Sequence, residues 1–205
     1  MRVGLDFDNT IVSYDGLFHK VALEGGWIPP DLRVSKVCVR DHLRLIGKEG
    51  VWTEMQGLVY GARMAEAEAF PGVKEFLFWA QAEGISVSIV SHKTRYPFLG
   101  PKYDLHLAAR DWIAAWLHDA TRPLVKPENV FFELTKEDKV RRIGEVDCGL
   151  YVDDLPEILL AQEFPPSTTK VLFDPDGNHR DINLSCATNW GEVQLMVKEQ
   201  WLLTR

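Results

Sequence analysis

Val3-Gly4-Leu5-Asp6-Phe7-Asp8-Asn9-Thr10 is the stretch of this sequence that decides the fold. The run from Val3 to Phe7 is short and largely apolar, which is typical of a buried strand, and two aspartates stand at its end. In a parallel α/β sheet the carboxyl ends of the strands meet at one crevice. We therefore expect Asp6 and Asp8 to belong to a site at that edge of the sheet.

The pair Asn9-Thr10 predicts a turn directly after the strand. Such a turn would bring Asp8 beside the reaction centre, where one carboxylate can attack a phosphorus atom and the other can carry a proton to the leaving oxygen. A calcium loop that begins D-x-D is the alternative. That loop needs glycine where this chain has Ile11, and glutamate where it has Leu17.

Two further segments place polar groups at the ends of apolar runs. Ser91 follows the apolar stretch 85–90, and Asp153-Asp154 follows 150–152. Adjacent carboxylates at a buried strand end repel each other unless a cation compensates them. Mg²⁺ prefers a few carboxylates together with water and phosphate oxygens. The sequence therefore predicts a Mg²⁺ site at this acidic pair, with a solvated turn as the alternative.

A lysine completes the pattern. Thr135, with Asp138 three residues on, is typical of a helix N-terminus, and Lys139 lies one turn into that helix. A lysine at this position could neutralise the nucleophile and the transferred phosphoryl group. Lys136 is a rival candidate at the same helix start.

Short apolar runs alternate with helical patterns over most of the chain. The expected strands are 3–7, 85–91, 130–132, 150–152 and 171–173, of which 171–173 is taken as the last core strand. Helices are expected at 73–84 and 105–116, after Thr135, and from Asn189 onward. The alternation predicts an α/β fold with a doubly wound parallel sheet.

Residues 12–68 lack this alternation. They contain helical stretches at 35–46 and 51–64, separated by glycines. We expect residues 12–68 to form a small helical cap insertion, and residues 1–11 and 69–205 to form the α/β core.

The composition limits the class of protein. The chain has 205 residues, 46% of them hydrophobic, and a formal net charge of −7, which argues against nucleic acid as a partner. No apolar run approaches the roughly 20 residues that a membrane helix needs, and the N-terminus turns acidic too soon for a signal peptide. Three cysteines without a C-x-x-C pair are typical of reduced, buried thiols. We expect a soluble, cytoplasmic protein that does not bind membranes.

Taken in order, the segments around Asp6, Ser91, Lys139 and Asp153-Asp154 resemble the motifs of the haloacid dehalogenase-like (HAD-like) superfamily of phosphohydrolases, over about residues 1–175. The resemblance implies a Rossmann-like core, Mg²⁺ as cofactor and an aspartyl-phosphate intermediate. Asp6 would be the nucleophile and Asp8 the general acid and base. An aspartate at position 8 favours the phosphatases over the dehalogenase branch.

The same resemblance implies the remaining contacts. Ser91 and Lys139 would hold the phosphoryl group, with Asn9 and Thr10 in the turn that positions Asp8. Asp6 and Asp154 would bind Mg²⁺ together with Asp153 beside them and the backbone carbonyl of Asp8.

Basic residues near these motifs bear on the substrate. His92 and Lys93 directly follow Ser91 and are expected to contact phosphate or substrate. In the insertion, Lys36, Arg40 and Arg44 lie on one helical face and could bind a second anionic group. A solvated helix face is the alternative for these three residues.

We therefore expect a Mg²⁺-dependent phosphatase that hydrolyses a phosphomonoester of a small metabolite, such as a nucleotide or a sugar phosphate, as a monomer or homodimer. A phosphatase of polynucleotide ends or of proteins, a phosphomutase, and a non-catalytic binding domain on the same scaffold are the alternatives.

Overall fold

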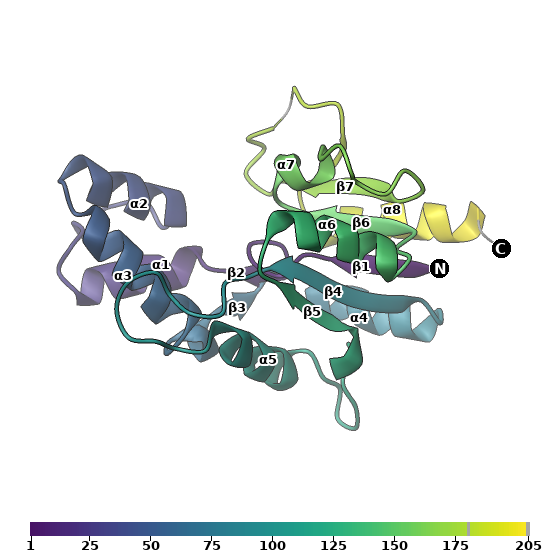
Figure 1. Cartoon of the computed structure of the whole chain (residues 1–205), viewed down its shortest axis with the longest axis horizontal. Coiled ribbons are helices and arrows are strands. Elements are labelled where there is room, and N and C mark those ends of the chain that lie inside the picture. The colour runs from purple at the N-terminus through teal and green to yellow at the C-terminus, as the bar shows by residue number, and fades with distance from the viewer. Residues whose placement is uncertain (180, 204–205) are drawn as a thin grey trace. The chain divides into compact units, whose positions relative to one another are not determined.

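The computed structural model describes residues 1–179 and 181–203 (Figure 1). The chain divides into two compact units. Unit 1 comprises Met1–Ile11, Ala69–His92 and the chain from Leu117 onward, and unit 2 comprises Val12–Glu68 and Lys93–Trp116.

Unit 1 is built on a six-stranded sheet whose strand order is β5-β4-β1-β6-β7-β8, with all neighbouring strands parallel. The strands are β1 (Arg2–Leu5), β4 (Ser86–His92), β5 (Val130–Glu133), β6 (Leu150–Asp153), β7 (Thr169–Phe173) and β8 (Ser185–Ala187). From β1 the chain first builds the sheet toward β5 and then returns to build it toward β8. The sheet is therefore doubly wound, and its order reverses at β1, as predicted.

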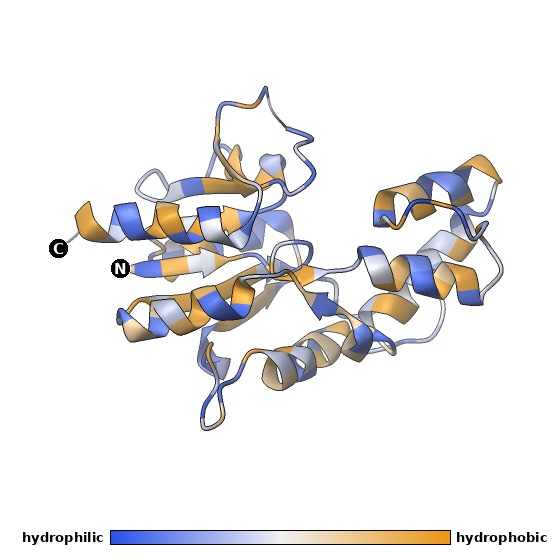
Figure 2. Cartoon of the chain, turned by 180° about the vertical axis from the view of Figure 1, so that it is seen from behind, coloured by the Kyte–Doolittle hydropathy of each residue, from blue (hydrophilic) through white to orange (hydrophobic). Residues whose placement is uncertain are grey.

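Helices cover both faces of this sheet. They are α4 (Val73–Ala82), α6 (Lys136–Glu145), α7 (Pro156–Leu159) and α8 (Trp190–Leu203), and a 3₁₀ turn, η2 (Pro127–Asn129), precedes β5. The apolar side chains of α6 and α7 pack with β4, β6 and β7 on the face toward the viewer in Figure 1. Figure 2 shows the opposite face, where α4 and α8 lie in front of the strands. There the Trp190 ring packs on Phe76 and Phe173, with ring centroids 5.1 and 5.9 Å apart.

Local signals explain most of these boundaries. The Thr135 hydroxyl accepts a hydrogen bond from the backbone N–H of Asp138 at 3.0 Å, which starts α6 as predicted. Gly84 has a φ of +70° just after α4, the conformation with which glycine commonly ends a helix. The sequence-based assignment of 171–173 as the last core strand is wrong, because β8 follows it. β8 is only three residues long and Ser185 is exposed, so it lacks an apolar run.

Unit 2 contains the helices α1 (Asp15–Glu24), α2 (Lys36–Leu45), α3 (Glu49–Tyr60) and α5 (Leu105–Trp116), with a 3₁₀ turn, η1 (Met64–Glu66). Two short strands, β2 (Val12–Ser13) and β3 (Glu68–Ala69), pair with each other. An aromatic cluster forms part of its core. The Phe18 ring contacts Trp52 at a centroid distance of 4.9 Å and Tyr60 at 5.5 Å.

The units differ from the predicted division in one segment. Residues 93–116 were assigned to the core, but they group with unit 2. Close packing explains this: a Cβ added to Gly57 would lie 2.7 Å from Pro97, and one added to Gly61 would lie 2.5 Å from Tyr103. The indole N–H of Trp112 also donates to the carbonyl of Ala67 at 2.9 Å. The segment is thus fastened to α3 and the turn that follows it.

None of the helices in the described part of the chain has the length and apolar character needed to cross a membrane. Cys38, Cys148 and Cys186 are free thiols, but only Cys148 is fully buried, which corrects the expectation that all three are buried.

Gly4 in β1 offers a test of the packing under the central strand. A Cβ at this position would lie 2.5 Å from the Tyr151 ring and 2.6 Å from the Cys148 sulfur, so Gly4→Ala forces a buried aromatic ring to move. We expect the free energy of unfolding to fall by about 1–3 kcal/mol, measured by urea denaturation.

Gly50→Ala is the matched control, since a Cβ there meets nothing within 4 Å and the residue lies in α3. Alanine is favoured over glycine in helices, so stability should stay the same or rise. Equal losses in the two variants would contradict the packing described for Gly4.

Candidate active site

The carboxyl ends of β1, β4 and β6 bring together residues that lie far apart in the sequence. Asp6 directly follows β1, and its backbone N–H donates to the carbonyl of Val152 at 2.9 Å. β1 lies between β4, which carries Ser91, and β6, which ends at Asp153. This is the point where the strand order reverses, and crevices at such points are where open α/β sheets bind ligands.

Lys139 occupies the centre of this group. Its ammonium nitrogen lies 2.6 Å from Asp6 Oδ1 and 2.7 Å from Asp153 Oδ2. The side chains of Lys139 and Asp153 are 1% and 0% exposed, so both ion pairs are shielded from water. Lys136, the rival candidate, instead pairs with Glu157 at 3.0 Å on the surface.

Burial and charge act on this cluster in opposite directions. Burial alone would lower the pKa of Lys139, but the carboxylates of Asp153 and Asp6 outweigh it and raise that pKa above its ordinary value. Burial raises the pKa of Asp153 to about 7. The Lys139 ammonium acts to lower this pKa, and the negative charge of Asp6 acts to raise it. Lys139 is therefore a permanent cation, and Asp153 is an acid whose ionisation depends on the cations around it.

Hydrogen bonds fix the orientation of both carboxylates. The Ser91 hydroxyl donates to Asp6 Oδ1 at 2.8 Å, the same oxygen that Lys139 contacts. The backbone N–H of Leu155 donates to Asp153 Oδ1 at 3.0 Å. The ring centroid of Tyr151 lies 5.8 Å from the Lys139 ammonium. The sequence did not single out Tyr151, because it resembles an ordinary strand residue.

The chain turns sharply after Asp6, as predicted. Asn9 has a φ of +59°, and the backbone N–H of Ile11 donates to the carbonyl of Phe7 at 3.1 Å. The Trp190 indole N–H anchors the turn by donating to the Thr10 carbonyl at 3.2 Å. Thr10 is fully buried, and within residues 1–179 and 181–203 its hydroxyl has no hydrogen-bond partner. The half-buried Asp8 lies on this turn.

Three carboxylates form a group that suits a metal ion. Asp6, Asp153 and Asp154 each place an oxygen within 4.8 Å of the other two. Together with Lys139 they carry a formal charge of −2 when all are ionised, which one divalent cation would balance. All the donors are oxygens, as a hard cation such as Mg²⁺ requires. The Asp8 carboxylate is not in this group, and a role for the Asp8 backbone carbonyl stays a prediction.

The two basic residues after Ser91 lie in different surroundings. A ring nitrogen of His92 lies 3.2 Å from the carbonyl of Leu134, and burial lowers the pKa of His92. Lys93 belongs to unit 2, where its ammonium lies over the Tyr60 ring. The structure thus brings together the predicted Asp6, Ser91, Lys139, Asp153 and Asp154, and it does not add Lys93 to the group within unit 1.

Solved structures share this architecture. No protein-family model and no curated protein sequence matches the chain. A predicted phosphatase from Clostridium acetobutylicum is 12% identical, with a TM-score of 0.58, over 97% of this chain and 98% of that chain. A HAD family hydrolase from Deinococcus radiodurans R1 with bound phosphate and sodium is 16% identical, with a TM-score of 0.57, over 98% and 96%. The fold is HAD-like.

A third solved structure with a similar fold is a phosphoglucomutase. An archaeal β-phosphoglucomutase from Pyrococcus sp. strain ST 04 is 12% identical, with a TM-score of 0.55, over 96% of this chain and 97% of that chain. At these identities the likeness is one of fold, and it spans nearly the whole length of both proteins.

Lys139→Met tests the central ion pairs. The substitution keeps the length of the side chain but leaves Asp6 and Asp153 buried without their shared cation. We expect the free energy of unfolding to fall by about 3–5 kcal/mol in metal-free buffer, measured by urea denaturation.

Lys136→Met is the control three residues earlier in the same helix, where the ion pair with Glu157 is exposed. It should change the free energy of unfolding by no more than about 0.5 kcal/mol. A Lys139→Met protein as stable as the control would rule out the ion pairs described here.

Proposed function

We propose that this chain is a Mg²⁺-dependent phosphatase that hydrolyses a phosphomonoester of a small metabolite in the cytoplasm. The observation that carries the proposal is the assembly of Asp6, Ser91, Lys139 and the Asp153-Asp154 pair at the reversal point of a HAD-like sheet. A nucleophilic carboxylate, a buried cation, a hydroxyl donor and an acidic group for a metal are the parts that phosphoryl transfer needs.

In the first step, a carboxylate oxygen of Asp6 attacks the phosphorus atom, and the bond from phosphorus to the leaving oxygen breaks. Asp8 gives its proton to that oxygen, so an alcohol leaves and Asp6 carries the phosphoryl group. Ser91 and Lys139, which hold Asp6 Oδ1, keep the attacking group in one orientation and supply donors to the phosphoryl oxygens.

In the second step, Asp8 takes a proton from a water molecule, whose oxygen attacks the phosphorus. The bond to Asp6 breaks, inorganic phosphate leaves, and both aspartates return to their first state. The turn with Asn9 at positive φ would hold Asp8 for both proton transfers, because Ile11 and Trp190 anchor its backbone.

Asp6, Asp153 and Asp154 would hold the Mg²⁺ ion. When bound, the ion offsets the repulsion between the Asp6 carboxylate and the negatively charged phosphate.

Metal binding can be measured directly. We expect Mg²⁺ to bind at one site by isothermal titration calorimetry, and we expect Asp154→Asn to weaken binding by at least about tenfold, because it removes a charged ligand oxygen. Asp147→Asn is the control, since Asp147 is exposed and its φ of +54° suits asparagine. Equal Mg²⁺ affinity in the two variants would exclude Asp154 as a ligand.

Activity tests the whole proposal. Hydrolysis of p-nitrophenyl phosphate should require Mg²⁺ and should fall by at least about a thousandfold in Asp6→Asn, because the amide cannot act as the nucleophile. The same variant should keep its fold by circular dichroism. Metal-independent turnover, or full activity in Asp6→Asn, would contradict an aspartyl-phosphate mechanism.

A further inference from the structure

Many charged side chains of unit 2 are engaged with partners in the same unit. The ion pairs include Arg40 with Asp41 at 2.8 Å, Arg44 with Glu49 at 2.7 Å and Arg63 with Glu24 at 2.6 Å. Lys36 and Lys93 lie over the Tyr60 ring, with their ammonium nitrogens 5.6 and 4.9 Å from its centroid. At Arg40 and Arg44 the predicted basic face of α2 is therefore a solvated surface of ion pairs, the alternative given for it.

Asp111 on α5 has no such partner. In the part of the chain that the structure describes, its carboxylate makes no ion pair and no hydrogen bond. Arg110 is its neighbour in the sequence, but successive residues of a helix point about 100° apart around the axis. The Arg63 guanidinium, on the turn against which α5 packs, is held by Glu24 and Glu66. The negative charge of Asp111 is thus open to a cation from outside the chain.

Two tryptophans share the side of α5 that carries Asp111. Asp111, Trp112 and Trp116 fall within a sector of about 140° around the helix axis. The rings of Trp112 and Trp116 stack nearly parallel, with centroids 5.6 Å apart and planes inclined by 14°. The Trp112 indole N–H donates to the Ala67 carbonyl at 2.9 Å, which fixes the inner ring. This side of α5 therefore presents a firmly held aromatic surface together with a carboxylate.

These side chains line a pocket of about 330 Å³ in unit 2. Asp111, Trp112 and Trp116 come from α5, and Met64 comes from the turn that follows α3. The remaining lining residues are alanines and one glycine, whose small size leaves the space open. Pockets for small molecules commonly have volumes of about 300–1,000 Å³, so this one suits a small ligand.

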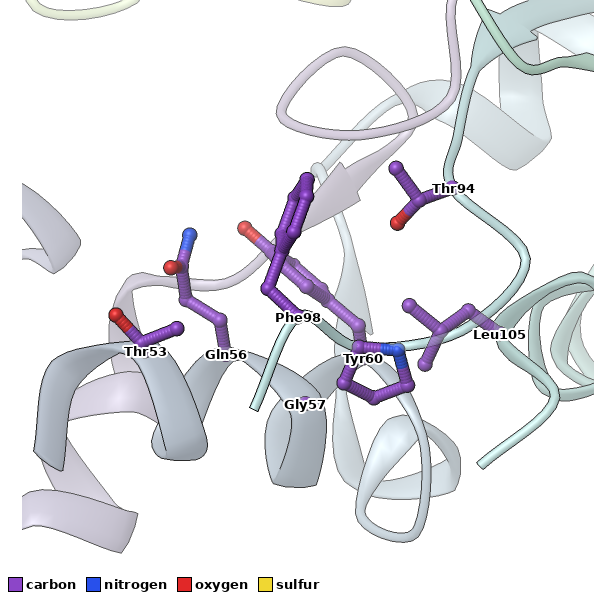
Figure 3. Close-up of a pocket in the computed structure, with 8 residues that line it drawn as sticks. Thr53, Gln56, Gly57, Tyr60, Thr94, Phe98 and Leu105 are labelled. Carbon is purple, nitrogen blue, oxygen red and sulfur yellow. The ribbon is translucent and has the colours of Figure 1, made fainter. Parts of the chain in front are cut away.

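Two other pockets of unit 2 each have only part of this chemistry. The pocket in Figure 3, of about 130 Å³, includes the rings of Tyr60 and Phe98, and none of its described lining residues is charged. A pocket of about 300 Å³ includes Glu66 and Glu68 but no aromatic ring among its described lining residues, and its Lys20 would repel a cation. The pocket at α5 combines aromatic rings with a carboxylate, and its described wall carries no cation.

An aromatic face and a carboxylate both attract positive charge. A primary ammonium needs acceptors for three N–H groups. Among the described side chains of the wall, the acceptors are the Asp111 carboxylate and the Met64 sulfur, which already accepts from the Tyr14 hydroxyl at 3.5 Å. An ammonium whose hydrogens are replaced by methyl groups needs no acceptor, and its methyl groups suit an alanine wall.

We propose that this pocket binds a small quaternary ammonium ion, whose positive nitrogen is attracted by the Trp116 ring and the Asp111 carboxylate. Binding depends on residues of unit 2 alone, so it is independent of the proposed phosphatase activity.

Three small ligands test the proposal by calorimetry in metal-free buffer. They are choline, its neutral isostere neohexyl alcohol, in which carbon replaces the nitrogen, and ethanolamine, the corresponding primary amine. The wild type should bind choline about tenfold or more tightly than either of the others. Asp111→Asn and Trp116→Leu should each lower the affinity for choline by about threefold or more.

Matched controls come from the two other pockets of unit 2. Phe98→Leu removes a ring from the uncharged pocket and Glu68→Gln removes a carboxylate from the pocket without rings, so both should keep the affinity for choline. Circular dichroism checks the fold of each variant. Should Trp116→Leu not fold, Asp111→Asn decides, because Asp111 is exposed and asparagine has the same shape.

The proposal is overturned if choline binds no more tightly than neohexyl alcohol or ethanolamine, or if its advantage survives in Asp111→Asn. An equal loss of affinity in Glu68→Gln and Asp111→Asn would also overturn it, because choline would then be attracted by the acidic surface in general.

Discussion

The buried contact of Lys139 with Asp6 and Asp153 is the interaction on which the arrangement of the candidate site depends. Each of these charges would be costly to bury alone, and an unpaired one would destabilise the fold or lose its charge. Together they connect the ends of β1 and β6 with helix α6, although Lys139 lies 133 residues from Asp6 in the sequence. The ammonium thus fixes where the sheet edge, Asp6 and Asp153 stand relative to one another.

The doubly wound sheet makes this contact possible with little local strain. Because β1 lies between β4 and β6, the ends of three strands open side by side, and each contributes one polar residue. At this edge of the sheet Asn9 has a positive φ, in the turn that follows Asp6 and Asp8. The core below is ordinary apolar packing, so the polar groups gather at one edge.

The sequence was sufficient for the parts of the structure that are encoded locally. Strand ends with acidic or hydroxyl residues and the Thr135 cap are short patterns, so Asp6, Ser91, Lys139 and Asp153 could be predicted to meet. β8 was missed because three residues with an exposed serine carry no strand pattern. The grouping of 93–116 with unit 2 could not be predicted, since it depends on contacts such as Trp112 with Ala67 that join distant residues. The placement of Lys36 and Lys93 over one ring is non-local in the same way.

Unit 2 is assembled from two separate pieces of chain, and this affects how it could be exchanged between proteins. The polypeptide passes between the units four times, at residues 11–12, 68–69, 92–93 and 116–117. A graft of 12–68 alone would leave Gly57 and Gly61 without the Pro97 and Tyr103 they pack against, and Ala67 without Trp112. Unit 2 would therefore be transferred intact only by paired exchange of both segments, and a single recombination event would break its packing.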